Sequence, residues 1–391
     1  MPSIEIELLT TDETLKRLCL LYWEVNEAPN FKYKVADISK ALGISSIQMS
    51  AMLAEGCRAY SHQQVCPNCS TPHIFKNRVD YQSIFRGPEK LCDSCLLEAR
   101  EIERVRKETE LEKKKEIIRR TFSLSPRPAL DIKSLTLEDA IGLLSFIRLT
   151  ASESLISYGP LSSFAQPLAP TGLIIETTIR LMQAGHIIVH PNTSPEFFVF
   201  ENGAPISMLT LHVTWALSTG DDLKATQDLI TRLESTIKTR PIWPESWNGE
   251  CLQLWRKIGI YECLEYLEVV LTEHKLPAKF GEKTHLVLTE LIERFSVGQI
   301  YNMMWRAARD AAAFHARVGG PKQHAANTVI GSLQRQADRS NAEGWELKPY
   351  RRDRRCPQSM FSQILFDTAL QIGERGFDKA PNVEEQIVDQ T

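Results

Sequence analysis

The 391-residue sequence lacks the features that identify several broad classes of protein. No uncharged apolar run approaches the roughly 18 residues needed to cross a bilayer, so we expect no membrane span. The first residues, Met1-Pro2-Ser3-Ile4-Glu5, contain neither a basic stretch nor an apolar core, and we expect no secretory signal. The formal net charge of −3 gives no overall attraction to a polyanion or a membrane surface. Any such binding must come from local patches.

Motifs of common enzyme classes are also missing. The sequence has no Gly-x-x-x-x-Gly-Lys-Ser/Thr loop, no Gly-x-Gly-x-x-Gly and no Gly-x-Ser-x-Gly turn. His315 and His324 could act as acid and base or bind a metal, but no carboxylate pair or His-Glu-x-x-His motif accompanies them. We interpret both histidines as structural, and the sequence favours a protein without catalytic activity.

Most of the cysteines show no pattern. Five of the nine are scattered along the chain: Cys19, Cys57, Cys251, Cys263 and Cys356. This usage suits a reducing compartment, where thiols serve as small core residues, and it predicts a cytoplasmic protein.

The other four cysteines form two C-x-x-C pairs, Cys66-Pro67-Asn68-Cys69 and Cys92-Asp93-Ser94-Cys95, with 22 residues between them. A two-residue spacer lets one tight turn aim both sulfurs at the same point, and Zn²⁺ prefers four thiolates in a tetrahedron. A disulfide or a redox pair is the alternative, but neither explains why the pair occurs twice. The pattern therefore predicts one structural Zn²⁺ per chain, bound by Cys66, Cys69, Cys92 and Cys95.

The residues around these pairs suggest a particular zinc module in residues 61–96. Ile74-Phe75 and Tyr81–Phe85 are expected as short strands, and a helix is expected to start directly after Cys95. A knuckle, a hairpin and then a helix that carries the last two ligands resembles the treble-clef group of zinc fingers. That group includes DNA-binding, ribosomal, nuclease and protein-interaction modules. His73 alone does not supply a nuclease motif.

Residues 1–60 have the pattern of a helix-turn-helix domain. Asp12 is the expected N-cap of a first helix, and residues 35–42 and 46–53 are two short helices. Gly43 supplies a left-handed residue at the turn between them, and Ser45 caps the second helix. The expected small core consists of Ile38, Leu42, Ile47 and Leu53.

The second of these short helices has the dimensions to enter a DNA major groove. The candidate DNA-contacting residues of this region are Ser46, Gln48, Ser50, Lys40 and Arg58. Gln48 could bond an adenine edge. The region is poor in arginine, so a helix-turn-helix used for packing or protein contact remains the alternative.

Residues 97–122 are predicted to be a charged helical spacer, because opposite charges recur three or four residues apart. Residues 134–206 form a possible winged-helix domain. A helix from Thr171 is followed there by Gly185, a strand at 187–191 and a second strand at 196–200.

Residues 207–380 are predicted to be an α-helical body, and residues 381–391 a flexible tail. The expected helices of the body are 221–238, 246–257, 260–275, 284–295, 297–317, 322–341 and 358–374. Homodimerisation or contact with a protein partner is assigned to this body.

The densest cationic segment runs from Trp345 to Cys356. Its candidate nucleic-acid-binding residues are Lys348, Arg351, Arg352, Arg354 and Arg355, interleaved with Trp345 and Tyr350. The alternative is a loop whose arginines pair with neighbouring acidic helices.

Together these patterns predict a mainly α protein with two candidate functions. The first is a zinc-containing DNA-binding protein, regulatory in character, whose helical body dimerises or senses a partner. The second is a protein-interaction or scaffold component of a bacterial mobile-element or phage-defence system, without intrinsic catalysis. Burial of the arginine segment by acidic groups would favour the second.

Overall fold

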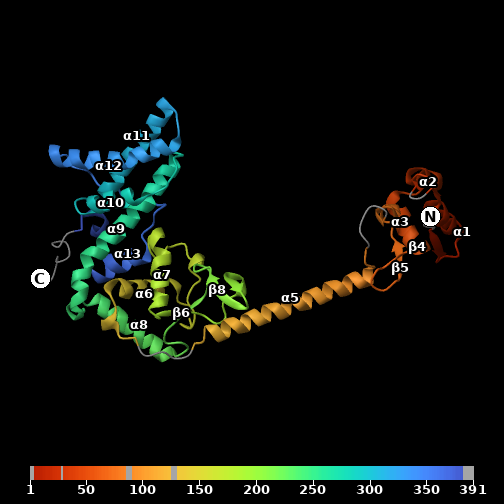
Figure 1. Ribbon diagram of the computed structural model, residues 1–391, viewed down its shortest axis with the longest axis horizontal. Coiled ribbons are helices and arrows are strands. Elements are labelled where there is room, and N and C mark those ends of the chain that lie inside the picture. The colour runs from red at the N-terminus through yellow and green to blue at the C-terminus, as the bar shows by residue number, and fades with distance from the viewer. Residues whose placement is uncertain (1–3, 28–29, 85–89, 125–129, 382–391) are drawn as a thin grey trace. The chain divides into compact units, whose positions relative to one another are not determined.

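The fold is mainly α and divides into two compact units, Met1–Leu111 and Glu112–Thr391 (Figure 1). The computed structural model describes residues 4–27, 30–84, 90–124 and 130–381. The predicted tail at 381–391 therefore lies almost wholly outside the described residues. None of the described helices is both long and apolar enough to cross a membrane.

Unit 1 combines short helices with a three-stranded antiparallel sheet of order β1-β4-β5. Its elements are β1 (Glu5–Leu8), α1 (Glu13–Trp23), β2 (Val25–Glu27), β3 (Asn30–Phe31), α2 (Val35–Leu42), α3 (Ser46–Gly56), β4 (Cys57–Val65), β5 (Pro72–Phe75), α4 (Arg78–Ile84) and the start of α5 (Asp93–Thr121). The predicted caps are present. Asp12 accepts hydrogen bonds from the backbone N–H groups of Thr14 and Leu15, and Gly43 has φ of 66° after α2.

One residue expected in the core of unit 1 lies outside it. Ile47 has an exposed fraction of 82%, whereas Met49 and Leu53 on the same helix are buried. Successive residues turn by about 100° around a helix, so Ile47 points away from the side that Met49 and Leu53 bury. The prediction that Ile47 fills the core was wrong.

A second correction concerns residues 81–84, which were expected as a strand and belong to helix α4 instead. Phe85 lies outside the described residues. Asn77 Oδ1 accepts from Asp80 N at 2.9 Å and starts the helix. The buried Arg78 then holds α4 against α1, because its Nε donates to Tyr22 O at 2.7 Å and its guanidinium lies 4.5 Å from the centre of the Tyr22 ring. These contacts come from residues that are distant in sequence.

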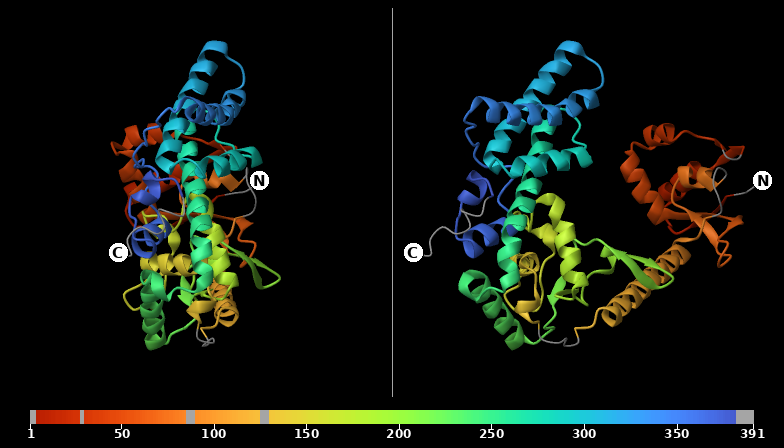
Figure 2. Two further views of the ribbon diagram at one scale, coloured as in Figure 1. Left: turned by 90° about the vertical axis from the view of Figure 1, so that its left-hand side faces the viewer. Right: turned by 60° about the vertical axis from the view of Figure 1, so that its left-hand side comes forward.

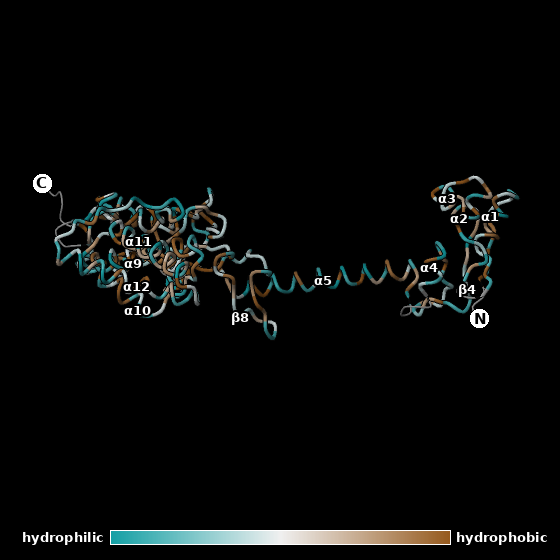
Figure 3. Tube along the Cα trace, turned by 90° about the horizontal axis from the view of Figure 1, so that it is seen from above, coloured by the Kyte–Doolittle hydropathy of each residue, from teal (hydrophilic) through white to brown (hydrophobic). Residues whose placement is uncertain are grey.

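Helix α5 is a single helix of 29 residues, about 43 Å long at the usual rise per residue. Its surface is mostly hydrophilic along its length (Figure 3). Arg104 pairs with Glu101 at 2.5 Å and with Glu108 at 2.9 Å, as the spacing of charges predicted. Ile118, near its last turn, is fully buried in the core of unit 2.

Unit 2 is built from longer helices and two small two-stranded sheets. Its helices are α6 (Leu137–Thr150), α7 (Ile174–Gln183), α8 (Leu223–Lys238), α9 (Glu245–Glu273), α10 (Glu282–Ile292), α11 (Val297–Val318), α12 (Lys322–Glu343), α13 (Met360–Gln363) and α14 (Arg375–Asp378). Its strands are β6 (Ile187–Val189), β7 (Phe198–Glu201), β8 (Ala204–Met208) and β9 (Trp215–Leu217). Helices α11 and α12 lie side by side (Figures 1 and 2).

The two strands expected at 187–191 and 196–200 do not pair with each other. β6 pairs with β9, and β7 pairs with β8. Tyr158 adds an isolated bridge to Trp215, so the chain before α7 joins the same small sheet. The strand expected at 196–200 starts later, at Phe198, after a 3₁₀ turn.

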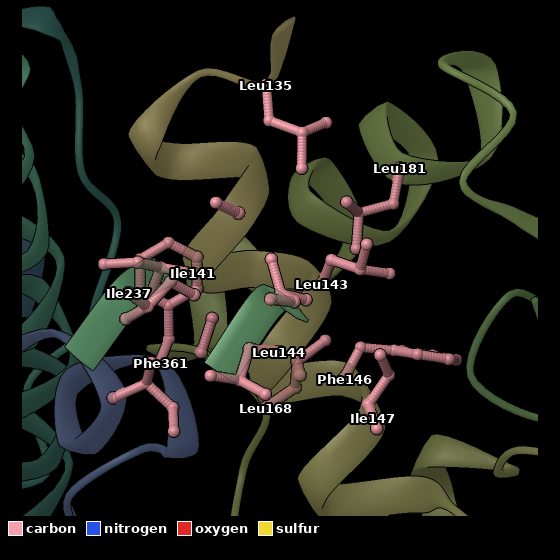
Figure 4. Packing of buried hydrophobic residues seen from close by; sticks show 14 of the residues in the cluster. Leu135, Ile141, Leu143, Leu144, Phe146, Ile147, Leu168, Leu181, Ile237 and Phe361 are labelled. Atoms are coloured by element: carbon pink, nitrogen blue, oxygen red, sulfur yellow. The ribbon is translucent and has the colours of Figure 1, made fainter. Parts of the chain in front are cut away.

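Two hydrophobic clusters form the core of unit 2. The first includes Phe146, Leu229 and Phe361, and so joins the stretches predicted as winged helix and helical body (Figure 4). The second lies between the C-terminal part of α9 and helices α10 to α12. The sequence predicted a break near Gly259, but α9 is continuous there. A Cβ at Gly259 would lie 2.8 Å from Ile292 Cδ1, so this glycine allows two helices to approach rather than ending one.

Candidate functional site

The candidate metal centre lies in unit 1, where the turn between β4 and β5 meets the start of α5. Cys66 and Cys69 lie on that turn. It is closed by hydrogen bonds from Cys66 N to Thr71 O and from Ser70 N to Cys66 O, both 2.9 Å. Ser70 has φ of 58°, which bends the chain sharply after Cys69. The turn therefore brings both sulfurs to one side of the hairpin.

Cys92 directly precedes α5 and Cys95 lies in its first turn, where Leu96 N donates to Cys92 O at 2.9 Å. The ligand sulfurs of all four cysteines lie within 4.8 Å of one another, and Cys69 Sγ is 3.6 Å from Cys92 Sγ. Four sulfurs at the usual Zn–S distance of about 2.3 Å would be about 3.8 Å apart in a tetrahedron. The four cysteines can therefore hold a metal ion, and their geometry fits zinc.

Backbone and side-chain N–H groups point at these sulfurs. Cys92 N donates to Cys66 Sγ at 3.3 Å, and this bond is the main reason that the pKa of Cys66 is lowered to about 6. The Asn68 amide, 3.3 Å from Cys95 Sγ, also favours the thiolate of Cys95. The sulfurs of Cys69, Cys92 and Cys66 outweigh that amide and raise the pKa of Cys95 to about 12. The raised pKa of Cys95 shows that four negative charges are unfavourable at these positions, so a bound cation would stabilise all four thiolates.

The described residues between the two cysteine pairs do not form the expected hairpin. The hairpin β4–β5 instead has the first pair at its tip, and the chain between β5 and the second pair includes helix α4. One feature of the expected module is present, because the last two candidate ligands lie at the start of a helix. Among the described residues, no second group of three or more His, Cys, Asp or Glu side chains could hold a metal.

The predicted DNA-contacting residues of unit 1 are all exposed, but some have structural roles. Gln48 Oε1 accepts from Ser45 N at 2.9 Å, and the two residues form a capping box at the start of α3. Ser50 Oγ donates to Ser46 O at 3.1 Å. Arg58 lies 3.8 Å from Glu7. Lys40, on α2, is exposed and forms no ion pair within the described part of the chain.

The arginine segment separates into buried and exposed side chains. Arg352 forms a bidentate ion pair with the buried Glu262, at 3.0 and 3.1 Å, and its guanidinium lies 4.4 Å from the centre of the Phe377 ring. Arg355 pairs with Asp353 at 2.8 Å and Glu273 at 3.0 Å. Arg352 is therefore occupied within the fold. Arg351, Arg354 and Lys348 are exposed, and no ion pair of theirs is found among the described residues.

A cleft of about 1220 Å³ beside the metal centre was missed by the sequence analysis. Its lining includes Ile74, Val79 and Leu96, which are exposed, and Lys76, which pairs with Asp93 at 2.7 Å. The cleft is formed by residues of β5, α4 and the start of α5, so it exists only once these elements pack together, and no local pattern indicated it.

No protein-family model, curated protein or solved structure matches the chain, so its function must be argued from these sites.

Proposed function

We propose that the protein is a zinc-containing DNA-binding protein and that helix α3 is the element that enters the major groove. The observation that carries this proposal is the solvent side of α3. Ser46, Ile47 and Ser50 are exposed there and contribute nothing to the core, while Met49 and Leu53 of the same helix are buried in it. Hydroxyl groups and an apolar side chain on one helix face suit base edges and thymine methyl groups.

Phosphate contacts would come from the preceding helix, which in such motifs crosses the DNA backbone. Lys34 and Lys40 lie at the two ends of α2, are exposed, and form no ion pair among the described residues. Neutralising two phosphates gives a slope of about −1.8 for log affinity against log salt. Affinity would then fall only about tenfold between 50 and 200 mM salt. The proposed binding mode has a weak salt dependence.

In this proposal the metal is Zn²⁺ and its role is structural. Four thiolates fill the tetrahedron, so no coordination position remains for a substrate. The ion would join the β4–β5 hairpin to α5 and hold unit 1 in one conformation. Cys66, Cys69, Cys92 and Cys95 are its ligands.

We also propose a winged-helix-like arrangement in unit 2, starting near residue 134 and extending beyond 206 to Leu217. It is supported by the order α6, the bridge at Tyr158, α7, β6 and β9, with the β7–β8 hairpin in the place of the wing. Its helix α7 does not suit DNA contact. Arg180 on α7 pairs with Glu138 and Asp139, and Glu176 pairs with Lys257. We assign this winged-helix-like arrangement to packing.

The DNA proposal is tested by incubating the full chain with a random-sequence duplex library and sequencing the bound fraction. We expect an enriched motif, and we expect Ile47→Glu to weaken its binding at least tenfold in fluorescence anisotropy. Val79→Glu is the matched control. It makes the same change at a position that is 73% exposed, on α4. Enrichment of no motif, or equal losses for the two variants, would refute DNA reading by α3.

The scaffold alternative is favoured by the cleft beside the metal centre. Ile74 and Val79 are 54% and 73% exposed on its rim, so an apolar segment of a partner could bury them. In that case Val79→Glu would abolish capture of a protein partner and Ile47→Glu would not. The same two variants therefore distinguish the two functions.

A further inference from the structure

Unit 2 carries a surface where aromatic and basic side chains are interleaved along α11. The segment after α12 runs beside this helix and is fixed by hydrogen bonds to it. Tyr350 N donates to Gly298 O at 2.8 Å, and Asn302 Nδ2 donates to Lys348 O at 2.8 Å. A Cβ at Gly298 would lie 2.7 Å from Tyr350 O, so the absence of a side chain there permits this approach.

The contact between the helix and the segment brings together five side chains and Lys348, whose carbonyl bonds to α11. We call these residues the Trp345 patch: Trp305, Arg306, Arg309, Trp345, Lys348 and Tyr350. The guanidinium of Arg306 lies 4.7 Å from the centre of the Trp345 ring, and that of Arg309 lies 5.2 Å from the Trp305 ring. Trp305 and Tyr350 meet edge to face, with ring centroids 6.3 Å apart. The rings are therefore held in place before any ligand binds.

The rings of the Trp345 patch remain accessible. Trp345 is 37% exposed, and Trp305 and Tyr350 are half-buried against the second hydrophobic cluster. An exposed tryptophan above an arginine presents a flat, positively charged stacking surface. Such a surface suits the exposed face of an unpaired base. In a duplex the faces of the bases are covered by the neighbouring base pairs and cannot stack on Trp345.

The charge of the region is also suitable. Residues 297–355 contain eleven Lys and Arg residues against five Asp and Glu residues, in a chain whose net charge is −3. Glu346 and Asp310 are the acidic side chains next to the patch, and Asp310 pairs with Arg309 at 2.9 Å. Arg306 and Lys348 form no ion pair within the described residues. The patch therefore offers cations for phosphates beside rings for bases.

We propose that the Trp345 patch binds single-stranded nucleic acid, by stacking of a base on Trp345 and phosphate contacts to Arg306, Arg309 and Lys348. This goes beyond the proposed duplex binding by α3, since it lies in another unit and uses other chemistry. An acidic peptide would satisfy the cations but would leave the rings without a stacking partner, so the observations favour nucleic acid.

The test measures binding of the full chain to fluorescently labelled oligo-dT by anisotropy. Loss of a base stack is worth a factor of roughly 5 to 150, so we expect Trp345→Ala to weaken binding by that amount. Trp345→Phe keeps a ring and should retain most of the affinity. Arg306→Gln/Arg309→Gln should reduce the salt slope by about 1.4, since each single-strand phosphate contact contributes about 0.7.

The matched control is Arg317→Gln/Arg339→Gln. It removes the same two charges from α11 and α12 at exposed positions outside the patch, and it should leave affinity almost unchanged. Equal losses for both double variants would mean unspecific attraction and would overturn the proposal. Absence of oligo-dT binding would also overturn the proposal. The same holds if a poly-glutamate peptide binds as tightly as oligo-dT and its binding depends on Trp345.

The two proposals fail separately. Ile47→Glu should leave oligo-dT binding intact, and Trp345→Ala should leave binding of an enriched duplex intact. Circular dichroism of each variant establishes that it is folded. If Trp345→Ala does not fold, the Trp345→Phe variant still tests the stacking.

Discussion

The ion pair between Arg352 and Glu262 makes a sharp prediction about stability. Glu262, on α9, is only 2% exposed, and both of its carboxylate oxygens bond to Arg352. Ser362 Oγ donates a further hydrogen bond to Glu262 Oε1 at 2.7 Å. We therefore consider Arg352→Met, which keeps a long apolar side chain beside Phe377 and removes the charge.

The expected cost follows from what remains. After the substitution the carboxylate stays buried with one hydroxyl partner, and removing one member of a buried pair destabilises a protein by about 3–5 kcal/mol. Arg355→Met is the matched control in the same segment. Its pair with Glu273 is about half exposed on both sides, so the loss should stay below about 1 kcal/mol.

Urea unfolding followed by tryptophan fluorescence measures this difference. Trp23 is the only one of the seven tryptophans outside unit 2, so the signal reports mainly on unit 2. With a slope of about 3 kcal/mol per M, the midpoint should fall by about 1–2 M for Arg352→Met. Adding Glu262→Gln to that variant neutralises the stranded carboxylate and should recover part of the loss.

A midpoint shift for Arg352→Met no larger than that for Arg355→Met would refute this reasoning. It would mean that Arg352 is free in solution and available to a ligand. A double variant less stable than Arg352→Met alone would show that the cost comes from packing rather than from the unpaired charge.

Two further predictions concern the metal and pH. Elemental analysis should find about one zinc per chain. Cys69→Ser should lower the zinc content towards zero, while the control Ser70→Ala should not, and a chelator should unfold unit 1 without moving the unfolding transition of unit 2. A metal-free protein whose unit 1 is unchanged would contradict this prediction. Burial lowers the pKa of His190 from 6.5, so unfolded chains bind more protons and unit 2 should lose stability as pH falls below about 6.5. His190→Gln should flatten that dependence in thermal unfolding, and an unchanged slope would exclude His190 as its source.

Local patterns were predicted well where neighbouring residues decide the structure. Asp12 and Ser45 cap their helices, and Gly43 takes the left-handed conformation at the turn. Each C-x-x-C pair is arranged by its own local turn. That the two turns meet was inferred because one Zn²⁺ needs four thiolates. The long charged helix followed from ion pairs three and four residues apart.

Other features depended on partners far away in the chain. The sequence indicated a strand at residues 81–84, but Arg78 finds its partners in α1, more than 50 residues earlier, and helix α4 packs accordingly. A break was expected between residues 257 and 260, but α9 is continuous there, and Gly259 permits the close approach of Ile292.

Spacing within a few residues was enough to predict the four candidate metal ligands, the helix caps and the mainly helical class. Which arginines are free depends instead on contacts between distant parts of the chain. Arg352 and Glu262 are 90 residues apart, and nothing local indicates that burial joins them. The same holds for Trp345 and Arg306, which become one surface only when the segment after α12 packs along α11. Whether a charged side chain is buried in an ion pair or exposed to water depends on how distant parts of the chain pack.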